Sequence, residues 1–383
     1  MSTVASIAYA IVGIPLEHPI AFATQSVSVR HFGLLKIRTR DGAEGIGYSY
    51  LGAIPTRLVG IALEEWLAPW VLGADADRSD DLWEAMYAAT TLHGRTGAVM
   101  RAISLVDNTL WDLRARAAGV PLYQYLGGAA RASVECYAAS GYYAPGKTAA
   151  KLAAEMAGLV AAGFTAVKMK TGKGTPVEEA ARVKAVRAAI GDAPLLMLDA
   201  NNAWKDVATA MSYLDAFSAQ RPYWIEEPFS TDDIAAHAAL SAQTGITIAL
   251  GENEAGRWRF RELLDRVSGC IIQPDATACG GISEWLRIAK LAQSAQVTVC
   301  PHAYHDLHIH LAAAIPHAGM VEYMPGDDVM PFGKIIDRSL QHAGGRLLLP
   351  QTPGLGFQFV DPAIERYAVR PAGQQATWLT LNK

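Results

Sequence analysis

The sequence predicts an α/β protein, a TIM-like (β/α)₇β barrel that carries an α+β domain at its N-terminus. The first observation is a regular spacing: seven short apolar runs between Ala166 and Tyr323 each carry an ionisable side chain at or near their end. From Lys170 onward these side chains recur 20 to 29 residues apart, close to the length of one strand-plus-helix unit of a barrel. The second observation is length, because 383 residues accommodate a barrel of about 250 residues and one further domain.

The order of local patterns divides the chain into three parts. In residues 1–130, strand patterns with a turn at Asp41-Gly42 precede helical periodicity, which predicts an α+β capping domain. Strand–helix alternation over residues 131–350 predicts the barrel, which is the catalytic domain. Residues 351–383 are rich in turn-forming residues and no longer alternate, and we expect this tail to pack back on the capping domain.

Composition narrows the class of function. A net charge of −4 without a run of like charges gives no reason to expect nucleic acid or a membrane surface as a partner. The N-terminus lacks a basic segment, and the apolar stretch from Ile7 to Pro15 is too short to span a bilayer. Four cysteines without CxxC spacing favour reduced thiols, so we expect a cytoplasmic protein.

Three acidic residues, Asp199, Glu226 and Glu252, end three consecutive predicted strands. The carboxyl ends of barrel strands converge on one mouth, where three carboxylates without a counter-charge raise one another's pKa. A hard divalent cation removes this repulsion, and oxygen ligands favour Mg²⁺, with Mn²⁺ as a substitute. The alternative is that each acid separately caps a helix or pairs with a surface base. Glu227 points the opposite way from Glu226 along a strand, and the sequence alone does not choose between them.

Two lysines, Lys168 and Lys170, lie two positions apart and therefore share one face of their strand. In the barrel mouth, desolvation and a neighbouring cation would lower the pKa of a lysine toward neutrality, which makes it a usable general base. The alternative is a pair of solvated lysines at a strand end. Asn201 shares a face with Asp199 and is a candidate to hydrogen-bond a substrate or to hold a ligand.

His302 follows Asp275 by about one barrel unit, which predicts that the two lie on adjacent strands. An aspartate that accepts from one ring nitrogen raises the basicity of the other, so the pair is a candidate acid/base; a histidine taken alone is more often structural. Glu322, at the end of the last predicted strand, is a candidate hydrogen-bond donor to developing negative charge if it stays protonated. A zinc site is a competing interpretation of His302, His305, His308 and His310, although HExxH spacing is absent.

Taken together, these motifs resemble the enolase superfamily and, within it, the mandelate racemase group. The motifs that carry the resemblance are Lys168-x-Lys170, Leu198-Asp199-Ala200-Asn201, Trp224-Ile225-Glu226-Glu227-Pro228, Gly251-Glu252-Asn253, Pro274-Asp275, Pro301-His302, Glu322 and Pro353-Gly354-Leu355-Gly356, with Gly47-Tyr48-Ser49-Tyr50 near the N-terminus. They extend over essentially the whole chain, and the set is specific although each motif alone is weak.

The resemblance implies a metal centre and an assembly. Asp199, Glu226 and Glu252 would bind Mg²⁺, which chooses Glu226 over Glu227 by analogy only. The partner would be a small-molecule carboxylate substrate. The chain would form a homo-oligomer, commonly an octamer.

The resemblance also implies the acid/base groups. Lys170 would be the base on one face of the substrate, with the His302–Asp275 pair as acid/base on the other. Lys168 would help hold the substrate carboxylate and lower the pKa of Lys170, and Glu322 would hydrogen-bond the same carboxylate. The implied step is abstraction of the proton α to a carboxylate.

Two outcomes of that step divide the group. We favour dehydration of an acid sugar, an aldonate or aldarate, to a 2-keto-3-deoxy acid, because polar Tyr304 and His305 suit a polyol better than a phenyl ring. The alternative is racemisation or epimerisation of a 2-hydroxy acid, and a third possibility is a ligand-binding relative without catalysis. Ala139 stands where mandelate racemase has a serine, so Ser140 is the candidate replacement, and Tyr50 is a further candidate substrate contact.

Overall fold

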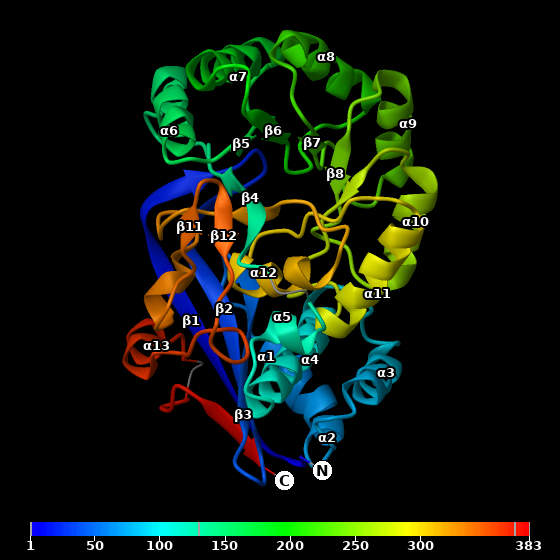
Figure 1. Cartoon of the computed structure of the whole chain (residues 1–383), viewed down its shortest axis with the longest axis vertical. Coiled ribbons are helices and arrows are strands. Elements are labelled where there is room, and N and C mark those ends of the chain that lie inside the picture. The colour runs from blue at the N-terminus through cyan, green and yellow to red at the C-terminus, as the bar shows by residue number, and fades with distance from the viewer. Residues whose placement is uncertain (1, 129–130, 371–372, 383) are drawn as a thin grey trace.

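The computed structural model describes residues 2–128, 131–370 and 373–382, which form two packed parts (Figure 1). One part is a four-stranded antiparallel sheet with its helices. The other is a ring of mainly parallel strands inside an arc of helices. The site described below lies where the two parts meet.

Three consecutive strands build the N-terminal sheet: β1 (Val4–Ala21), β2 (Ser26–Thr39) and β3 (Glu44–Gly52). Gly42, with φ of 91°, makes the turn between β2 and β3, which agrees with the Asp-Gly signal. The helices that follow are α1 (Leu58–Ala62), the π-helical turn η1 (Leu63–Leu67), α2 (Ala68–Val71), α3 (Ser79–Thr90), α4 (Gly97–Ala117) and α5 (Leu122–Tyr125).

Helix α4 packs directly on β3 because glycine lets the two backbones approach. A Cβ added at Gly45 would lie 2.5 Å from the Cβ of Leu113 and 2.5 Å from the carbonyl oxygen of Thr109. Apolar residues of the sheet and of α4, such as Ile37 and Ile103, are fully buried in the core between them. This packing fixes the position of α4, which carries side chains toward the barrel.

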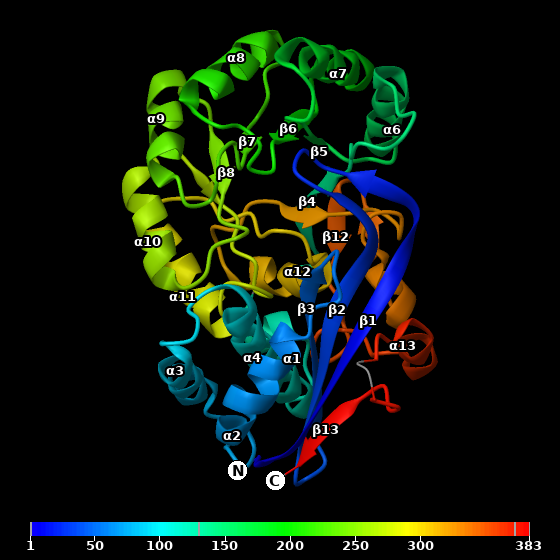
Figure 2. The same cartoon turned by 180° about the vertical axis from the view of Figure 1, so that it is seen from behind.

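A strand from the far end of the sequence completes the same sheet. β13 (Leu379–Asn382) pairs antiparallel with β1, from Asn382 opposite Ser6 to Leu379 opposite Tyr9. Figure 2 shows β13 beside β1 at the outer edge of the sheet. The sheet order is therefore β13-β1-β2-β3.

The parallel ring begins with six strands in chain order: β4 (Ser133–Ala139), β5 (Ala166–Lys170), β6 (Leu195–Asp199), β7 (Ile225–Glu226), β8 (Ile248–Leu250) and β9 (Ile271–Ile272). Isolated bridges continue it from Ile272 to Val299 and from Val299 to Ala318, and β10 (Val321–Tyr323) pairs in parallel with β4. The predicted barrel fold is confirmed. The strand expected over residues 297–302 is reduced to a bridge, and Pro301 lacks the N–H that would extend it.

Helices cover the outside of the ring. They are α6 (Ala149–Ala161), α7 (Pro176–Ile190), α8 (Val207–Phe217), α9 (Ile234–Thr244), α10 (Arg257–Arg266) and α11 (Gly281–Ser294), followed by α12 (His305–Ala314). The last helix, α13 (Asp361–Tyr367), packs against β1 of the N-terminal sheet instead. The remaining short elements are η2 (Ser218–Gln220), η3 (Pro331–Ile335), β11 (His342–Ala343) and β12 (Arg346–Leu348). Within the described ranges, no helix is both long and apolar enough to cross a membrane.

Side chains of α4 cap the start of α11 and so join the two parts. Asp107 accepts hydrogen bonds from the Ser283 N–H (2.8 Å) and from the Ser283 hydroxyl (2.7 Å). Asn108 accepts from the N–H of Ile282 at 2.9 Å. These bonds satisfy donors that a helix N-terminus otherwise leaves unpaired. We call this set of bonds the α4–α11 contact.

Candidate active site

One cavity of about 200 Å³ lies at the carboxyl ends of the barrel strands, facing the N-terminal part. Barrel residues singled out from the sequence that line it are Lys170, Asn201, Glu252, Asp275, His302 and Glu322. The N-terminal part contributes Phe22, Gln25, Arg30, Tyr50 and Arg101. Both parts of the molecule are therefore needed to form the cavity.

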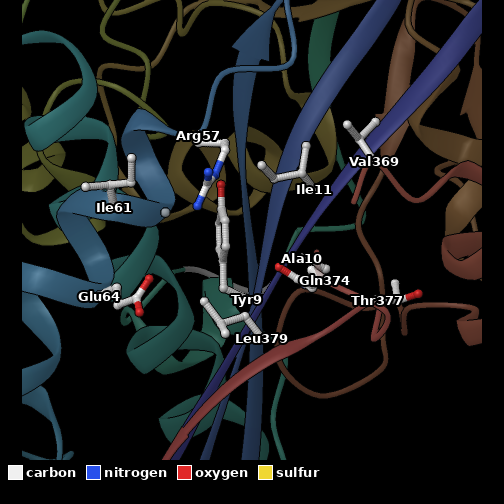
Figure 3. A pocket seen from close by; sticks show the side chains of 11 residues that line it. Tyr9, Ala10, Ile11, Arg57, Ile61, Glu64, Val369, Gln374, Thr377 and Leu379 are labelled. Atoms are coloured by element: carbon white, nitrogen blue, oxygen red, sulfur yellow. The ribbon is translucent and has the colours of Figure 1, made fainter. Parts of the chain in front are cut away.

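A second hollow, of about 40 Å³, lies between the N-terminal sheet and α1 and has no lining residue in common with the first. Figure 3 shows Tyr9 of β1 reaching toward Arg57. Its buried hydroxyl has no hydrogen-bond partner among the described residues. The hollow contains a single acid, Glu64, and none of the predicted site residues, so it is not the candidate active site.

The three predicted metal ligands lie together at the base of the barrel cavity. One carboxylate oxygen from each of Asp199, Glu226 and Glu252 lies within 4.8 Å of the other two, and this is the one such group found among the described residues. Asp199 and Glu226 are completely buried. An all-oxygen set of converging carboxylates fits Mg²⁺, which prefers hard oxygen ligands.

Glu227 is excluded from this group by the course of the chain. Strand β7 ends at Glu226, and Glu227 has a φ of 40°, so the alternation expected along a strand does not continue. The side-chain amide of Asn253 donates to both carboxylate oxygens of Glu227, at 2.9 and 3.1 Å. Both glutamates are buried, and the structure brings Glu226 to the other two acids.

The two lysines contact the acidic group from β5. Lys170 Nζ lies 2.5 Å from Asp199 Oδ2. Lys168 Nζ lies 2.5 Å from Glu226 Oε1 and 2.8 Å from Glu322 Oε1. The solvated alternative is wrong, because the side chains of Lys168 and Lys170 are 1% and 8% exposed.

His302 lies between two carboxylates. Its Nδ1 is 3.2 Å from Asp275 Oδ2, and its Nε2 is 3.3 Å from Glu252 Oε2. The second oxygen of Asp275 accepts from the N–H of Thr277 at 2.7 Å, which fixes the orientation of the carboxylate. His302 therefore contacts one candidate metal ligand, Glu252, as Lys170 contacts another, Asp199.

Two family models together match most of the chain. Residues 5–127 match the N-terminal domain of the mandelate racemase / muconate lactonizing enzyme family, and residues 151–363 match the enolase C-terminal domain-like family. The chain belongs to the mandelate racemase/muconate lactonizing enzyme family. This family is part of the enolase superfamily, so the resemblance predicted from the motifs is confirmed.

Named relatives of this mandelate racemase/muconate lactonizing enzyme family member include acid-sugar dehydratases and a lactone cycloisomerase. Arabinonate dehydratase of Saccharolobus solfataricus is 32% identical over 337 residues, which cover 87% of this chain and 89% of that protein. L-talarate/galactarate dehydratase of Salmonella typhimurium is 33% identical over 333 residues, which cover 86% and 81%. D-galactarolactone cycloisomerase of Agrobacterium fabrum is 32% identical over 367 residues, which cover 92% and 95%.

Solved structures of the family superimpose closely on this chain. The Salmonella typhimurium L-talarate/galactarate dehydratase superimposes with a TM-score of 0.89 at 29% identity, covering 100% of this chain and 94% of that chain. L-talarate dehydratase from Polaromonas sp. JS666, complexed with Mg and L-glucarate, has a TM-score of 0.89 at 30% identity and covers 100% of both chains.

Electrostatics in this family member favour the charged forms of two residues. Burial by itself lowers the pKa of Lys170, but the carboxylate of Asp199 outweighs it and raises the pKa above its usual range. The lowered pKa expected for Lys170 beside a neighbouring cation stays a prediction. Burial raises the pKa of Glu322, but the ammonium of Lys168 lowers it to about 2. Glu322 is therefore ionised here and accepts the N–H of Ala303 at 2.8 Å, instead of being a protonated donor.

The pKa of His302 is higher than that of an ordinary histidine. Burial lowers its pKa, but the carboxylates of Glu252 and Asp275 raise it to about 10. These carboxylates favour the protonated imidazolium, which is the form that can donate a proton.

Of the three predicted substrate-binding residues, Asn201 and Tyr50 line the cavity and Ser140 does not. Asn201 lines it, and its Oδ1 is buried without a hydrogen-bond partner among the described residues. The Tyr50 hydroxyl accepts from Arg30 at 3.0 Å. Ser140 does not line the cavity, because its hydroxyl donates to Glu155 at 2.6 Å beside a different hollow.

The other histidines form no metal site. His308 Nδ1 lies 2.8 Å from the carbonyl oxygen of Ala303, and His310 Nε2 lies 3.1 Å from that of Leu355. These are structural contacts, which removes the zinc interpretation.

The sequence analysis missed Arg30, Arg101 and Tyr142, all of which line the cavity. Arg30 had a detectable signal, since it is a charged residue inside the apolar strand pattern of β2. Arg101 had none, because an arginine near the start of a helix is common on protein surfaces.

Proposed function

We propose that this protein is an Mg²⁺-dependent hydro-lyase that dehydrates an acid sugar to a 2-keto-3-deoxy acid. The observation that carries the proposal is the group of three carboxylates, with Lys170 in contact with Asp199 and the Asp275-linked His302 in contact with Glu252. Relatives named as dehydratases of arabinonate, galactonate and rhamnonate support the substrate class.

Asp199, Glu226 and Glu252 would hold the metal. A bound Mg²⁺ supplies positive charge that stabilises negative charge developing on the substrate carboxylate. Whatever neutralises Asp199 also weakens its pull on the Lys170 proton, so the pKa of this lysine falls when the site is filled.

We assign Lys170 as the base that removes the proton from the α-carbon. The β-hydroxyl then leaves as water with the proton that His302 donates, and the resulting enol tautomerises to the 2-keto acid. Asp275 orients His302 through the 3.2 Å contact at Nδ1. Lys168, held between Glu226 and Glu322, places a fixed positive charge beside the reacting carboxylate.

Amide side chains around the reacting groups suit a polyol. Asn201, Asn202, Asn253 and Gln25 line the cavity and can hydrogen-bond hydroxyl groups, Asn253 through its carbonyl oxygen because its amide already donates to Glu227. Tyr50 remains a proposed substrate contact, and we leave Ser140 out of the site because its hydroxyl is bonded to Glu155.

A racemase or epimerase of a 2-hydroxy acid is the second candidate. It is favoured because two acid/base residues, Lys170 and His302, contact two different candidate metal ligands. Cycloisomerase activities are named for two relatives. Proton NMR in D₂O with Mg²⁺ against a panel of acid sugars tests these activities, with Lys170→Ala as the control. New 2-keto-3-deoxy resonances support dehydration. Loss of the C2 proton without a new skeleton indicates exchange or epimerisation, and no reaction of any acid counts against α-proton chemistry.

We also propose a homo-oligomer and a cytoplasmic location. Large apolar side chains exposed on the single chain, such as Trp70 (50%) and Leu92 (90%), support an assembly, which was expected to be an octamer. Light scattering after size exclusion measures the subunit number.

All four cysteines are buried free thiols, which supports the proposed location in a reducing compartment. Subcellular fractionation tests this location.

A further inference from the structure

Two arginines of the N-terminal part line the cavity that holds the candidate metal group. Arg30 comes from β2 and is 5% exposed, and Arg101 comes from α4 and is half-buried. They approach from the part of the molecule that faces the barrel mouth, whereas the acidic group belongs to the barrel strands.

Arg30 is a buried cation whose neighbours are neutral. Its Nε donates to the carbonyl oxygen of Val329 at 2.8 Å, and its Nη1 donates to the Tyr50 hydroxyl at 3.0 Å. The guanidinium also lies 5.4 Å from the centre of the Tyr50 ring. No acid within the described residues forms an ion pair with Arg30, although a buried charge is unfavourable without a counter-charge.

Arg101 extends the same positive region. Its Nη1 donates to the carbonyl oxygen of Tyr50 at 3.3 Å, so both arginines meet at Tyr50. Arg101 lines the same cavity as Asp275 and His302. No acid in the described part of the chain forms an ion pair with Arg101 either.

A row of aromatic rings connects this positive region to the acid/base pair. The Tyr50 and Tyr304 rings lie 6.0 Å apart, and the Tyr304 and His302 rings lie 5.9 Å apart. These rings line the cavity together with His302 and the two arginines.

We infer that Arg30 and Arg101 bind a second carboxylate, at the end of the substrate remote from the reacting carboxylate, so that the enzyme acts on sugar diacids (aldarates) in preference to sugar monoacids (aldonates). The inference rests on the proposed function and narrows its substrate class. A planar guanidinium matches a carboxylate through two parallel hydrogen bonds. A hydroxymethyl group, the corresponding end of an aldonate, leaves the buried charge of Arg30 without a counter-charge.

The test compares kcat/KM for an aldarate and the aldonate of the same configuration, over several configurations. Losing one charged hydrogen bond corresponds to a change on the order of 10- to 100-fold, so we expect at least that preference for the aldarate. Arg101→Gln should reduce the preference by a similar factor, mainly through KM. Arg30→Lys is the second variant, which keeps a buried cation but removes the fork geometry. Arg221→Gln is the matched control, because Arg221 pairs with Asp192 on the surface.

Each outcome decides the inference. Preference for the aldarate that falls in Arg101→Gln and stays in Arg221→Gln supports it. Equal turnover of the two acids, or an Arg101→Gln variant with unchanged preference, overturns it while the proposed dehydratase survives. A phosphorylated aldonate preferred over the aldarate overturns the diacid assignment. Absence of turnover and of α-proton exchange with all acids refutes the proposed function and this inference with it.

Discussion

The α4–α11 contact makes stability depend on pH in a way that Asp107→Asn should remove. Asp107 is completely enclosed, and burial raises its pKa from 3.8 to about 7, although the two hydrogen bonds from Ser283 lower it. As the pH rises above 3.8, the unfolded chain loses this proton while the folded protein keeps it until about pH 7. The free energy of unfolding therefore falls as the pH rises through this window.

The difference between the pKa of Asp107 in the unfolded and in the folded state sets the size of the effect. A difference between 3.8 and about 7 corresponds to about 4 kcal/mol in total, of which about 2.5 kcal/mol is lost between about pH 5 and about pH 8. Asparagine has nearly the same shape and does not titrate. The stability of the wild type relative to Asp107→Asn should therefore decrease by that amount over this interval.

Urea unfolding of both proteins at a series of pH values, followed by circular dichroism, measures the difference directly. Ser283→Ala is the matched control, because it removes one donor but leaves the titrating carboxyl, so its pH dependence should remain at least as steep as that of the wild type. Parallel curves for the wild type and Asp107→Asn would refute the reasoning, since they would mean that Asp107 has the same pKa in both states.

Three other predictions concern the metal, the base and the packing of the N-terminal sheet. Glu252→Gln should lower turnover by more than about 100-fold and shift the Mg²⁺ titration of activity to higher concentration; an unchanged titration contradicts its assignment as a ligand. Lys170→Ala should slow α-proton exchange in D₂O by about 10²- to 10⁴-fold while Mg²⁺ still binds by calorimetry, and exchange at the wild-type rate would exclude it as the base. Gly45→Ala should cost about 1–3 kcal/mol of stability in thermal unfolding, because its Cβ meets α4. Gly158→Ala is the control for that variant, since a Cβ there meets nothing within 4 Å, and equal melting temperatures for the two variants would contradict the packing argument.

The sequence predicted the barrel and most of the residues that meet in its mouth, for a physical reason. A buried parallel strand reads as an apolar run, and a charge at its end is conspicuous because it has no place in the core. Asp199, Glu226, Glu252, Asp275 and His302 all carried this signal.

What the sequence did not predict depends on distances between side chains. Glu322 is ionised rather than protonated because the ammonium of Lys168 lies 2.8 Å from its carboxylate. A local twist at Glu227, with φ of 40°, decided which glutamate joins the metal group. Arg101 was missed because its role arises only when α4 packs over the barrel.

The pairing of β13 with β1 has a consequence for biosynthesis. More than three hundred residues, including the entire barrel, separate these two strands in the chain. On the ribosome, β1 and β2 can form a hairpin early, but the segment of β1 from Ser6 to Tyr9 lacks its second neighbour until the barrel has been translated. An unpaired strand edge is a site where nascent chains associate wrongly, so this stretch of β1 is where we expect a chaperone to be most needed during synthesis.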